Sequence, residues 1–283
     1  RQRQMCIRDR CLFEKVYVET PVDTDGDGRL DLIAVYIRRP LETTQGMRVP
    51  AIYVANPYML ECNEDWYVPH DVDRDVSPYP QQHITESDIT FDPSTVSFPQ
   101  PRYPRATIGY ADTAPTEEIP LDCISDWYSY FNSRGYASVF CGGLGTRGSQ
   151  GFNCCGSPEE TAAFKAVIDW LNGRCRAFTN LTDNIEIRAD WCTGKVAMSG
   201  KSYLGTMCIA VASTGVEGLE TIIPEAAISN WYDYYRCNGL NLPAIGWQGD
   251  DLDILAKYCF SRAKDPEDYA SVREAYAAWL EGI

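Results

Sequence analysis

The segment GKVAMSGKSYLGTM, residues 194–207, decides the fold. A short apolar run at residues 196–198 is followed by Gly200, Ser202 and Gly205, and then by a second apolar segment. Glycines permit the strained backbone that a tight strand-to-helix turn requires. The order therefore predicts a strand, a turn that presents Ser202, and a helix.

The same segment contains Gly-Lys-Ser, which also ends a phosphate-binding loop. That loop requires a glycine five residues before Gly200, and the sequence has Lys195 there. Residues 196–198 have the composition of a strand, which cannot curl around a phosphate group. The pattern of a nucleophile turn is itself only partly met, because Leu204 occupies the position of its second glycine. From the pattern alone, a helix start with Ser202 as its cap is an equal alternative.

Strand-like and helical segments alternate on both sides of this turn. The strand-like segments are AIYVA (51–55), ASVFC (137–141) and KVAMS (195–199). Between the last two lies a helix signature, with Ser157 as the cap, Pro158 in the first turn and Glu160 at the capping-box position. Such alternation predicts an α/β fold with a mostly parallel sheet.

Residues 13–40 form two β-rich runs around a turn cluster, which is typical of a hairpin. Within the cluster, Asp23, Asp25 and Asp27 resemble the start of an EF-hand calcium loop. The twelfth position of such a loop holds a bidentate glutamate, and here it is Ala34 inside a strand-like run. The sequence favours an acidic hairpin without metal and leaves calcium binding as the minor alternative.

Composition excludes several classes of protein. The formal net charge of -15 argues against a nucleic-acid partner, because a phosphate backbone requires a basic surface. No apolar run approaches the roughly 18 residues that a membrane helix needs. The twelve cysteines are scattered without a C-x-x-C pair, and the opening RQRQMCIRDR is no secretory signal. We therefore expect a reduced, cytoplasmic protein with no membrane association, no cofactor and no metal.

Two segments stand outside the alternating pattern. Residues 1–11 match nothing that follows, so we leave them as an unassigned tail whose native origin is open. Residues 61–120 hold nine of the 17 prolines and little periodicity, which predicts an irregular insertion. After it, a short helix carries Trp127, Tyr130 and Phe131, which we expect on its apolar side.

The heptapeptide GKSYLGT (200–206) resembles the active-site segment of the Xaa-Pro dipeptidyl-peptidases, and more broadly of the peptidase S15 or CocE-type α/β-hydrolases. Their motif is G-x-S-Y-x-G, in which Gly205 takes the place of the second glycine. Further segments resemble the family in the same order: VDTDGDGRLDLIAVYIRRP (22–40), YASVFCGGLGTRGSQG (136–151) and GVEGLETIIPEAAISNWYDYYRCNG (215–239). The resemblance implies an α/β-hydrolase fold. Residues 12–225 would be the N-terminal part of the catalytic domain, and 226–283 the start of a helical cap in an incomplete domain.

The resemblance also implies catalytic roles. Ser202 is expected to attack the scissile carbonyl and form an acyl-enzyme. The oxyanion is expected to receive two hydrogen bonds, from the backbone N–H of Tyr203 and from the hydroxyl of Tyr58. The first donor agrees with helix physics, since a helix N-terminus presents N–H groups and the positive end of the dipole.

Specificity is implied for residues 230–253. Trp231 and Tyr234 match aromatic residues that wall a small pocket for proline, whose ring packs well on flat apolar faces. Asp250 stands where the family has a glutamate that binds the α-amine of the substrate. The shorter side chain departs from the family pattern, so Asp251 is an alternative amine ligand.

The largest departure concerns the catalytic triad. α/β-Hydrolases order their triad as nucleophile, acid and histidine, yet no histidine follows Ser202. Both histidines, His70 and His83, precede it. We interpret the chain as a fragment in which Ser202, without its base, is nearly inert.

The function implied by the resemblance is that of a serine exopeptidase, which releases N-terminal Xaa-Pro dipeptides from proline-containing peptides. A homodimer of the full-length enzyme is left open. Two alternatives remain: a related S15-type esterase or acylase, and a catalytically incomplete binding remnant. An aspartate and a histidine beyond residue 283 would favour an enzyme over the remnant.

Overall fold

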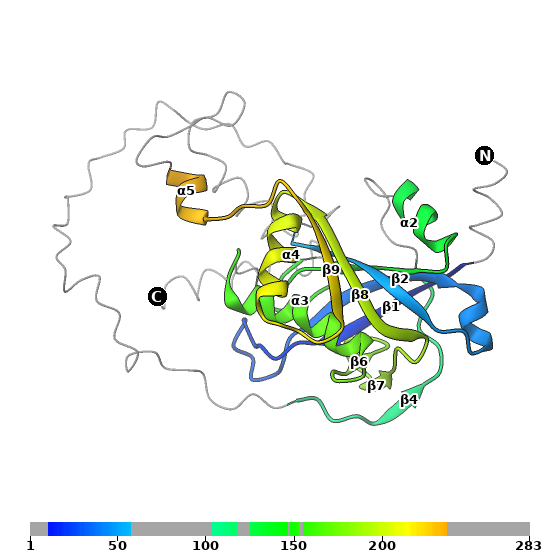
Figure 1. Cartoon of the computed structure of the whole chain (residues 1–283). Helices are drawn as coiled ribbons and strands as arrows, with labels where there is room; N and C mark the ends of the chain where they lie inside the picture. Colours follow the sequence, from blue (N-terminus) through cyan, green and yellow to red (C-terminus); the bar gives the residue numbers. More distant parts are fainter. Residues whose placement is uncertain (1–10, 58–103, 118–124, 147, 153–154, 237–283) are drawn as a thin grey trace, which may run out of the picture.

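The computed structural model describes residues 11–57, 104–117, 125–146, 148–152 and 155–236. The strands belong to one nine-stranded sheet (Figure 1). They are β1 (Cys11–Glu19), β2 (Leu32–Pro40), β3 (Val49–Asn56), β4 (Gly109–Ala111), β5 (Ala137–Gly142), β6 (Ala177–Phe178), β7 (Ile185–Ile187), β8 (Cys192–Lys201) and β9 (Leu219–Glu225). The helices are the 3-10 helix η1 (Leu41–Gln45), α2 (Ser125–Asn132), α3 (Pro158–Leu171), α4 (Tyr203–Ser213) and α5 (Trp231–Arg236).

The sheet is mixed, in the order β4-β7-β6-β1-β2-β5-β3-β8-β9. β1 and β2 pair antiparallel from Cys11↔Pro40 to Glu19↔Leu32, which confirms the predicted hairpin. The last four strands in the order, β5, β3, β8 and β9, run parallel to one another. This parallel half carries Ser202, and the whole arrangement is that of an α/β-hydrolase sheet.

The connections reverse direction across the sheet beside β3. β5 and β8 both follow β3 in the sequence, yet they lie on opposite sides of it. In open α/β sheets, ligands bind at the carboxyl ends of the strands where such a reversal occurs. Those ends are Asn56 of β3 and Lys201 of β8. The topology therefore places Ser202 at the edge where a site is expected.

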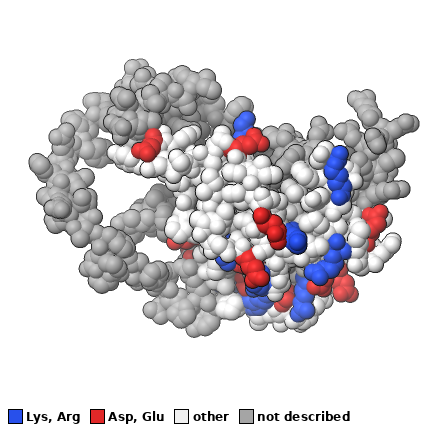
Figure 2. Space-filling view, viewed as in Figure 1, with Lys and Arg blue, Asp and Glu red and all other residues white. Residues whose placement is uncertain are grey.

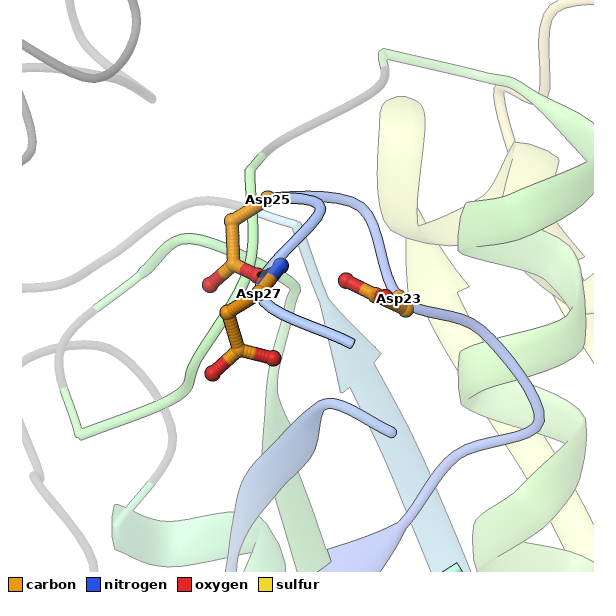
Figure 3. Close-up of side chains that lie close together, drawn as sticks. All are labelled: Asp23, Asp25 and Asp27. Atoms are coloured by element: carbon orange, nitrogen blue, oxygen red, sulfur yellow. Dashed lines mark hydrogen bonds between the residues drawn. The ribbon is translucent and has the colours of Figure 1, made fainter. Parts of the chain in front are cut away.

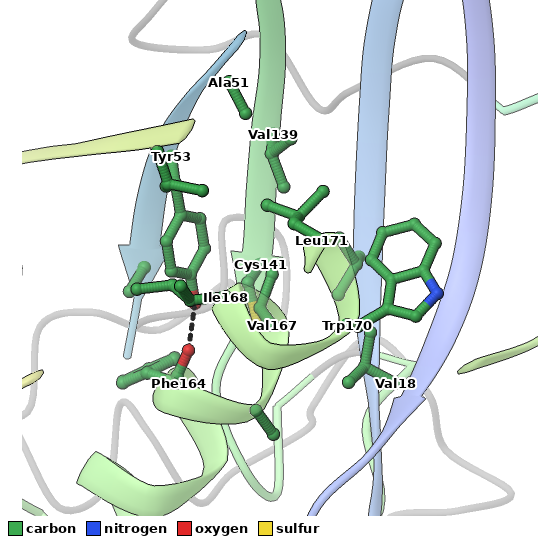
Figure 4. Close-up of a cluster of buried hydrophobic side chains, with 14 of the residues drawn as sticks. Val18, Ala51, Tyr53, Val139, Cys141, Phe164, Val167, Ile168, Trp170 and Leu171 are labelled. Atoms are coloured by element: carbon green, nitrogen blue, oxygen red, sulfur yellow. Dashed lines mark hydrogen bonds between the residues drawn. The ribbon is translucent and has the colours of Figure 1, made fainter. Parts of the chain in front are cut away.

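α3 packs on the sheet through a buried stripe. The stripe follows the i, i+3, i+4, i+7 spacing of an amphipathic helix, with Phe164, Val167, Ile168 and Leu171 all buried. Beneath them the hydroxyl of Tyr53 donates to the carbonyl of Phe164 at 3.2 Å (Figure 4). This bond satisfies a buried phenol and fixes β3 against the helix.

α2 belongs to a separate core cluster, formed by side chains that alternate along the strands with those beneath α3. Tyr128 is completely buried there, in the same cluster as Tyr36 and Phe140. Tyr130 is 52% exposed, so its predicted place on the apolar side is wrong. Tyr128, two positions earlier, packs against the sheet instead.

Residues 104–117 are the described part of the segment predicted as an irregular insertion. Within them, β4 pairs in parallel with β7, with Gly109 opposite Ile185. This portion extends the sheet at its edge. The division of the chain at residues 11, 61, 120 and 225 stays a prediction, because most of 61–120 and everything after residue 236 lie outside the described residues.

Two surface properties complete the description. Among the described residues, no helix is long and apolar enough to cross a membrane. Figure 2 shows acidic and basic side chains interspersed on one face of the molecule, so neither sign of charge forms a continuous patch there.

Candidate active site

Ser202 lies at the junction of β8 and α4, with φ 62° and ψ −124°. Few residues other than glycine adopt this region, because the Cβ atom crowds the neighbouring backbone. Two backbone hydrogen bonds hold the turn. The Ser202 N–H donates to Glu225 O at 2.8 Å, and Ser202 O accepts from the Thr206 N–H at 2.9 Å. The structure confirms the predicted strand, tight turn and helix.

The side chain of Ser202 is exposed and makes no capping hydrogen bond to α4. The alternative of an ordinary capping serine therefore does not describe this turn. What remains is a hydroxyl presented on a strained turn, at a helix N-terminus and at the carboxyl edge of parallel strands. This is the geometry that a serine nucleophile needs.

The shifted glycine of the motif has a steric reason. A Cβ atom at Gly205 would lie 2.6 Å from Glu225 O and 2.9 Å from Gly200 O. A Cβ at Gly200 would lie 2.5 Å from the Cβ of Leu204. α4 therefore crosses the ends of β8 and β9 so closely that both positions exclude a side chain, and the second glycine is needed at 205.

The side chain of Tyr203 enters a buried hydrogen-bond network with the start of α3. Its hydroxyl donates to Glu160 Oε2 at 2.5 Å. The Gly156 N–H donates both to the Tyr203 hydroxyl oxygen (2.6 Å) and to Glu160 Oε2 (2.8 Å). Burial raises the pKa of Glu160 to about 7, and the hydrogen bonds from Tyr203 and Gly156 oppose that rise.

Of the two hydrogen bonds in the predicted capping box, the structure has the one made by Ser157 and lacks the one expected from Glu160. Ser157 does cap α3, since its side chain accepts from the Glu160 N–H at 3.2 Å. The Glu160 carboxyl, however, accepts from the N–H of Gly156 and from Tyr203 instead of returning to Ser157. Glu160 is thus a fully buried carboxyl group in contact with Tyr203, which the sequence signature of a helix cap concealed.

Trp231 joins this group from α5. Its ring meets that of Tyr203 edge to face, with centroids 5.1 Å apart and planes at 83°. The structure therefore places Trp231 against the side chain of Tyr203, the residue that follows Ser202 in the sequence. Tyr234 lies on the same short helix and is 48% exposed.

The other predicted site residues lie outside the described residues. They are Tyr58, Asp250, its alternative Asp251, and the histidines His70 and His83. β3 ends at Asn56, two positions before Tyr58. The roles assigned to all these residues stay predictions.

The acidic loop of the hairpin gathers its carboxylates. Ligand oxygens of Asp23, Asp25 and Asp27 lie within 4.8 Å of one another (Figure 3). Asp23 accepts from the Gly28 N–H at 3.0 Å, and Asp25 accepts from the Asp27 N–H at 3.3 Å, so these carboxylates close the loop upon itself. Ala34, at the position of a calcium-binding glutamate, is buried in β2. The structure confirms the hairpin itself, and calcium binding by its three carboxylates stays the minor alternative.

The sequence matches the family model of the X-Pro dipeptidyl-peptidase (S15 family) over residues 25–281. The Xaa-Pro dipeptidyl-peptidase of Pediococcus pentosaceus is 44% identical over 272 residues, and that of Lactobacillus helveticus is 42% identical over 268. Both alignments cover 95% of this chain, and they cover 33% and 32% of the relatives. The chain thus spans about a third of the length of these curated relatives.

Among solved structures, similar chains include a CocE/NonD family hydrolase from Staphylococcus aureus, with a TM-score of 0.44 and 17% identity. That match covers 78% of this chain and 28% of the hydrolase. A putative dipeptidyl aminopeptidase IV from Bacteroides ovatus gives a TM-score of 0.44 at 11% identity, covering 93% of this chain and 26% of the other.

Proposed function

The chain belongs to the X-Pro dipeptidyl-peptidase (S15) family, and from this premise we propose that the full-length protein is a serine exopeptidase. It cleaves the bond after a penultimate proline and releases N-terminal Xaa-Pro dipeptides through an acyl-enzyme on Ser202. The observation that carries the proposal is the exposed Ser202 on a positive-φ turn between β8 and α4. The substrates are proline-containing peptides, and the proposed location is the cytoplasm.

Attack by the Ser202 hydroxyl places negative charge on the substrate carbonyl oxygen. In this proposal the backbone N–H of Tyr203, in the first turn of α4, donates to that oxygen, and the helix dipole adds a partial positive charge. The hydroxyl of Tyr58 is the second donor. Its position in the sequence supports this role, because it follows β3, the neighbour of β8 in the sheet.

Specificity is proposed to come from the segment that follows β9. Trp231 and Tyr234 wall the pocket for the proline ring, and the contact between Trp231 and Tyr203 supports a pocket beside the nucleophile. Asp250, or Asp251 in its place, binds the α-ammonium of the substrate. A carboxylate that binds the α-ammonium would limit the released product to a dipeptide.

The base and its acid are proposed to come from sequence after residue 283. A histidine takes the proton of Ser202 during attack and returns it to the leaving amine. Both histidines of this sequence precede Ser202, which is the reverse of the order in α/β-hydrolases.

The experiment is Ser202→Ala in the full-length protein, assayed with a chromogenic Xaa-Pro amide. Because acylation loses its nucleophile, kcat should fall by about 10⁴-fold or more. Ser213→Ala, at the exposed end of the same helix, is the matched control and should retain activity. Xaa-Pro turnover that survives Ser202→Ala would overturn the assignment. Turnover of esters without turnover of Xaa-Pro amides would identify a related esterase instead.

A further inference from the structure

A buried carboxyl group connects the nucleophile turn with the start of α3. Glu160, in the first turn of α3, has no exposed surface. Its Oε2 accepts hydrogen bonds from the Tyr203 hydroxyl and the Gly156 N–H. Its Oε1 has no hydrogen-bond partner among the residues that the structure describes. Capping alone does not require this arrangement, because Ser157 already accepts the Glu160 N–H.

This carboxyl is a costly group to keep inside the protein. Burial raises its pKa to about 7, which reflects the cost of holding a charged carboxylate away from water. An apolar side chain of similar size would avoid that cost. What the carboxyl achieves is orientation, since it fixes the hydroxyl of Tyr203 and thereby the direction of the ring.

The Tyr203 ring in turn supports Trp231. The two rings meet edge to face with centroids 5.1 Å apart. The indole also lies against Gly156, where an added Cβ atom would come within 2.7 Å of it. One indole therefore rests on the two residues that hydrogen-bond Glu160.

We infer that Glu160 is a positioning residue for the proline pocket, because it holds Tyr203 and Gly156 and these two hold the indole of Trp231. The inference rests on the proposed function, in which Trp231 borders the proline ring. Glu160 itself does not contact the substrate. Loss of its carboxyl lets the two rings shift, so discrimination between proline and a smaller residue falls while the chemistry at Ser202 is retained.

The test uses the full-length protein and compares kcat and KM for chromogenic Xaa-Pro and Xaa-Ala amides, together with turnover of p-nitrophenyl acetate. Glu160→Ala should lower the preference for proline by about tenfold, the effect of one lost buried hydrogen bond, mainly through a higher KM for the Xaa-Pro amide. The rate of p-nitrophenyl acetate hydrolysis should stay within about threefold of that of the unmodified protein. Glu160→Gln keeps an oxygen acceptor and should restore most of the preference. Glu186→Gln, at a buried carboxyl on β7, is the control and should change neither quantity.

Tyr203→Phe keeps the ring and removes only the hydroxyl, so it decides the question even where Glu160→Ala fails to fold. Its proline preference should fall as far as that of Glu160→Ala, and the double variant should fall no further. Additive losses, or an unchanged preference in folded Tyr203→Phe, would overturn the inference. If the unmodified protein shows no preference for proline, the proposed function fails and the inference falls with it. A preference that survives both substitutions refutes the inference alone.

Discussion

The backbone strain at Ser202 has a consequence for stability that does not depend on activity. Its φ of 62° and ψ of −124° lie in a region that glycine adopts readily and other residues rarely. The side chain is exposed and makes no capping bond, so its removal costs the folded state little. Ser202→Gly should therefore stabilise the fold although it removes the proposed nucleophile. Ser202→Ala retains the Cβ atom and with it the strain.

Two opposing contributions set the difference in unfolding free energy between Ser202→Gly and Ser202→Ala. A residue held in such a region costs about 1–3 kcal/mol, which glycine recovers. Glycine also adds conformational freedom to the unfolded chain, which costs roughly 0.5–1 kcal/mol. Ser202→Gly should thus exceed Ser202→Ala in unfolding free energy by about 1 kcal/mol. The backbone bonds to Glu225 and Thr206 persist in both variants, so they do not enter the difference.

Urea unfolding of the two full-length variants, followed by tryptophan fluorescence, measures this gap. The slope of the transition converts the difference between the midpoints into a free energy, and the Ser202→Gly midpoint should lie at the higher urea concentration. Ser213→Gly, at the last residue of the same helix, should instead destabilise by up to roughly 0.5 kcal/mol. A Ser202→Gly midpoint at or below that of Ser202→Ala would show that the turn stores no strain, and the reasoning would be refuted.

Two further predictions concern the contacts around this turn and the hairpin. Gly205→Ala should destabilise the protein by about 1–2 kcal/mol, because a Cβ atom 2.6 Å from Glu225 O costs more than the helix propensity it gains. A thermal midpoint at or above that of the unmodified protein would contradict this close approach. Burial raises the pKa of Asp31 from 3.8 to about 7, so its protonated form is the one that stabilises the fold. Relative to Asp31→Asn, the unmodified protein should be most stable below the unfolded pKa and lose roughly 4 kcal/mol of unfolding free energy as the pH rises from about 4 to about 7. A difference that stays constant with pH would mean that Asp31 titrates as it does in the unfolded chain.

The parts of the fold that could be predicted are those with local signals. The turn at Ser202 and the start of α3 depend on glycines, a cap and short apolar runs that stand together in the sequence. β6 and β7 have only two and three residues, which is too short for any periodicity. Their partners β1 and β4 come from distant segments, so the strand within residues 104–117 could not be distinguished from an irregular loop.

α2 shows the same limit within a single helix. Its sequence, SDWYSYFN, places aromatic residues on more than one side of eight residues, so spacing alone does not define an inner face. The sheet decides, because Tyr36 and Phe140 present an aromatic surface on which Tyr128 packs. Tyr130 faces solvent, and the Cζ atom of the Arg134 guanidinium lies over its ring, 3.5 Å from the ring centroid.

At the site, the sequence predicts where backbone groups lie but not which partners the side chains contact. A glutamate three residues after a serine cap fits the local signature wherever its carboxyl points, and the residue that redirects Glu160 is Tyr203, 43 positions later. The sequence predicts a role only for the backbone N–H of Tyr203, because the start of a helix defines the direction of that group alone. Its hydroxyl and ring meet Glu160 and Trp231 because α3, α4 and α5 converge on one edge of the sheet, and this convergence is a property of the fold. The turn at Ser202 has a local signal in its glycines and in the GKSYLGT heptapeptide, whereas Glu160, Tyr203 and Trp231 come together from three separate helices.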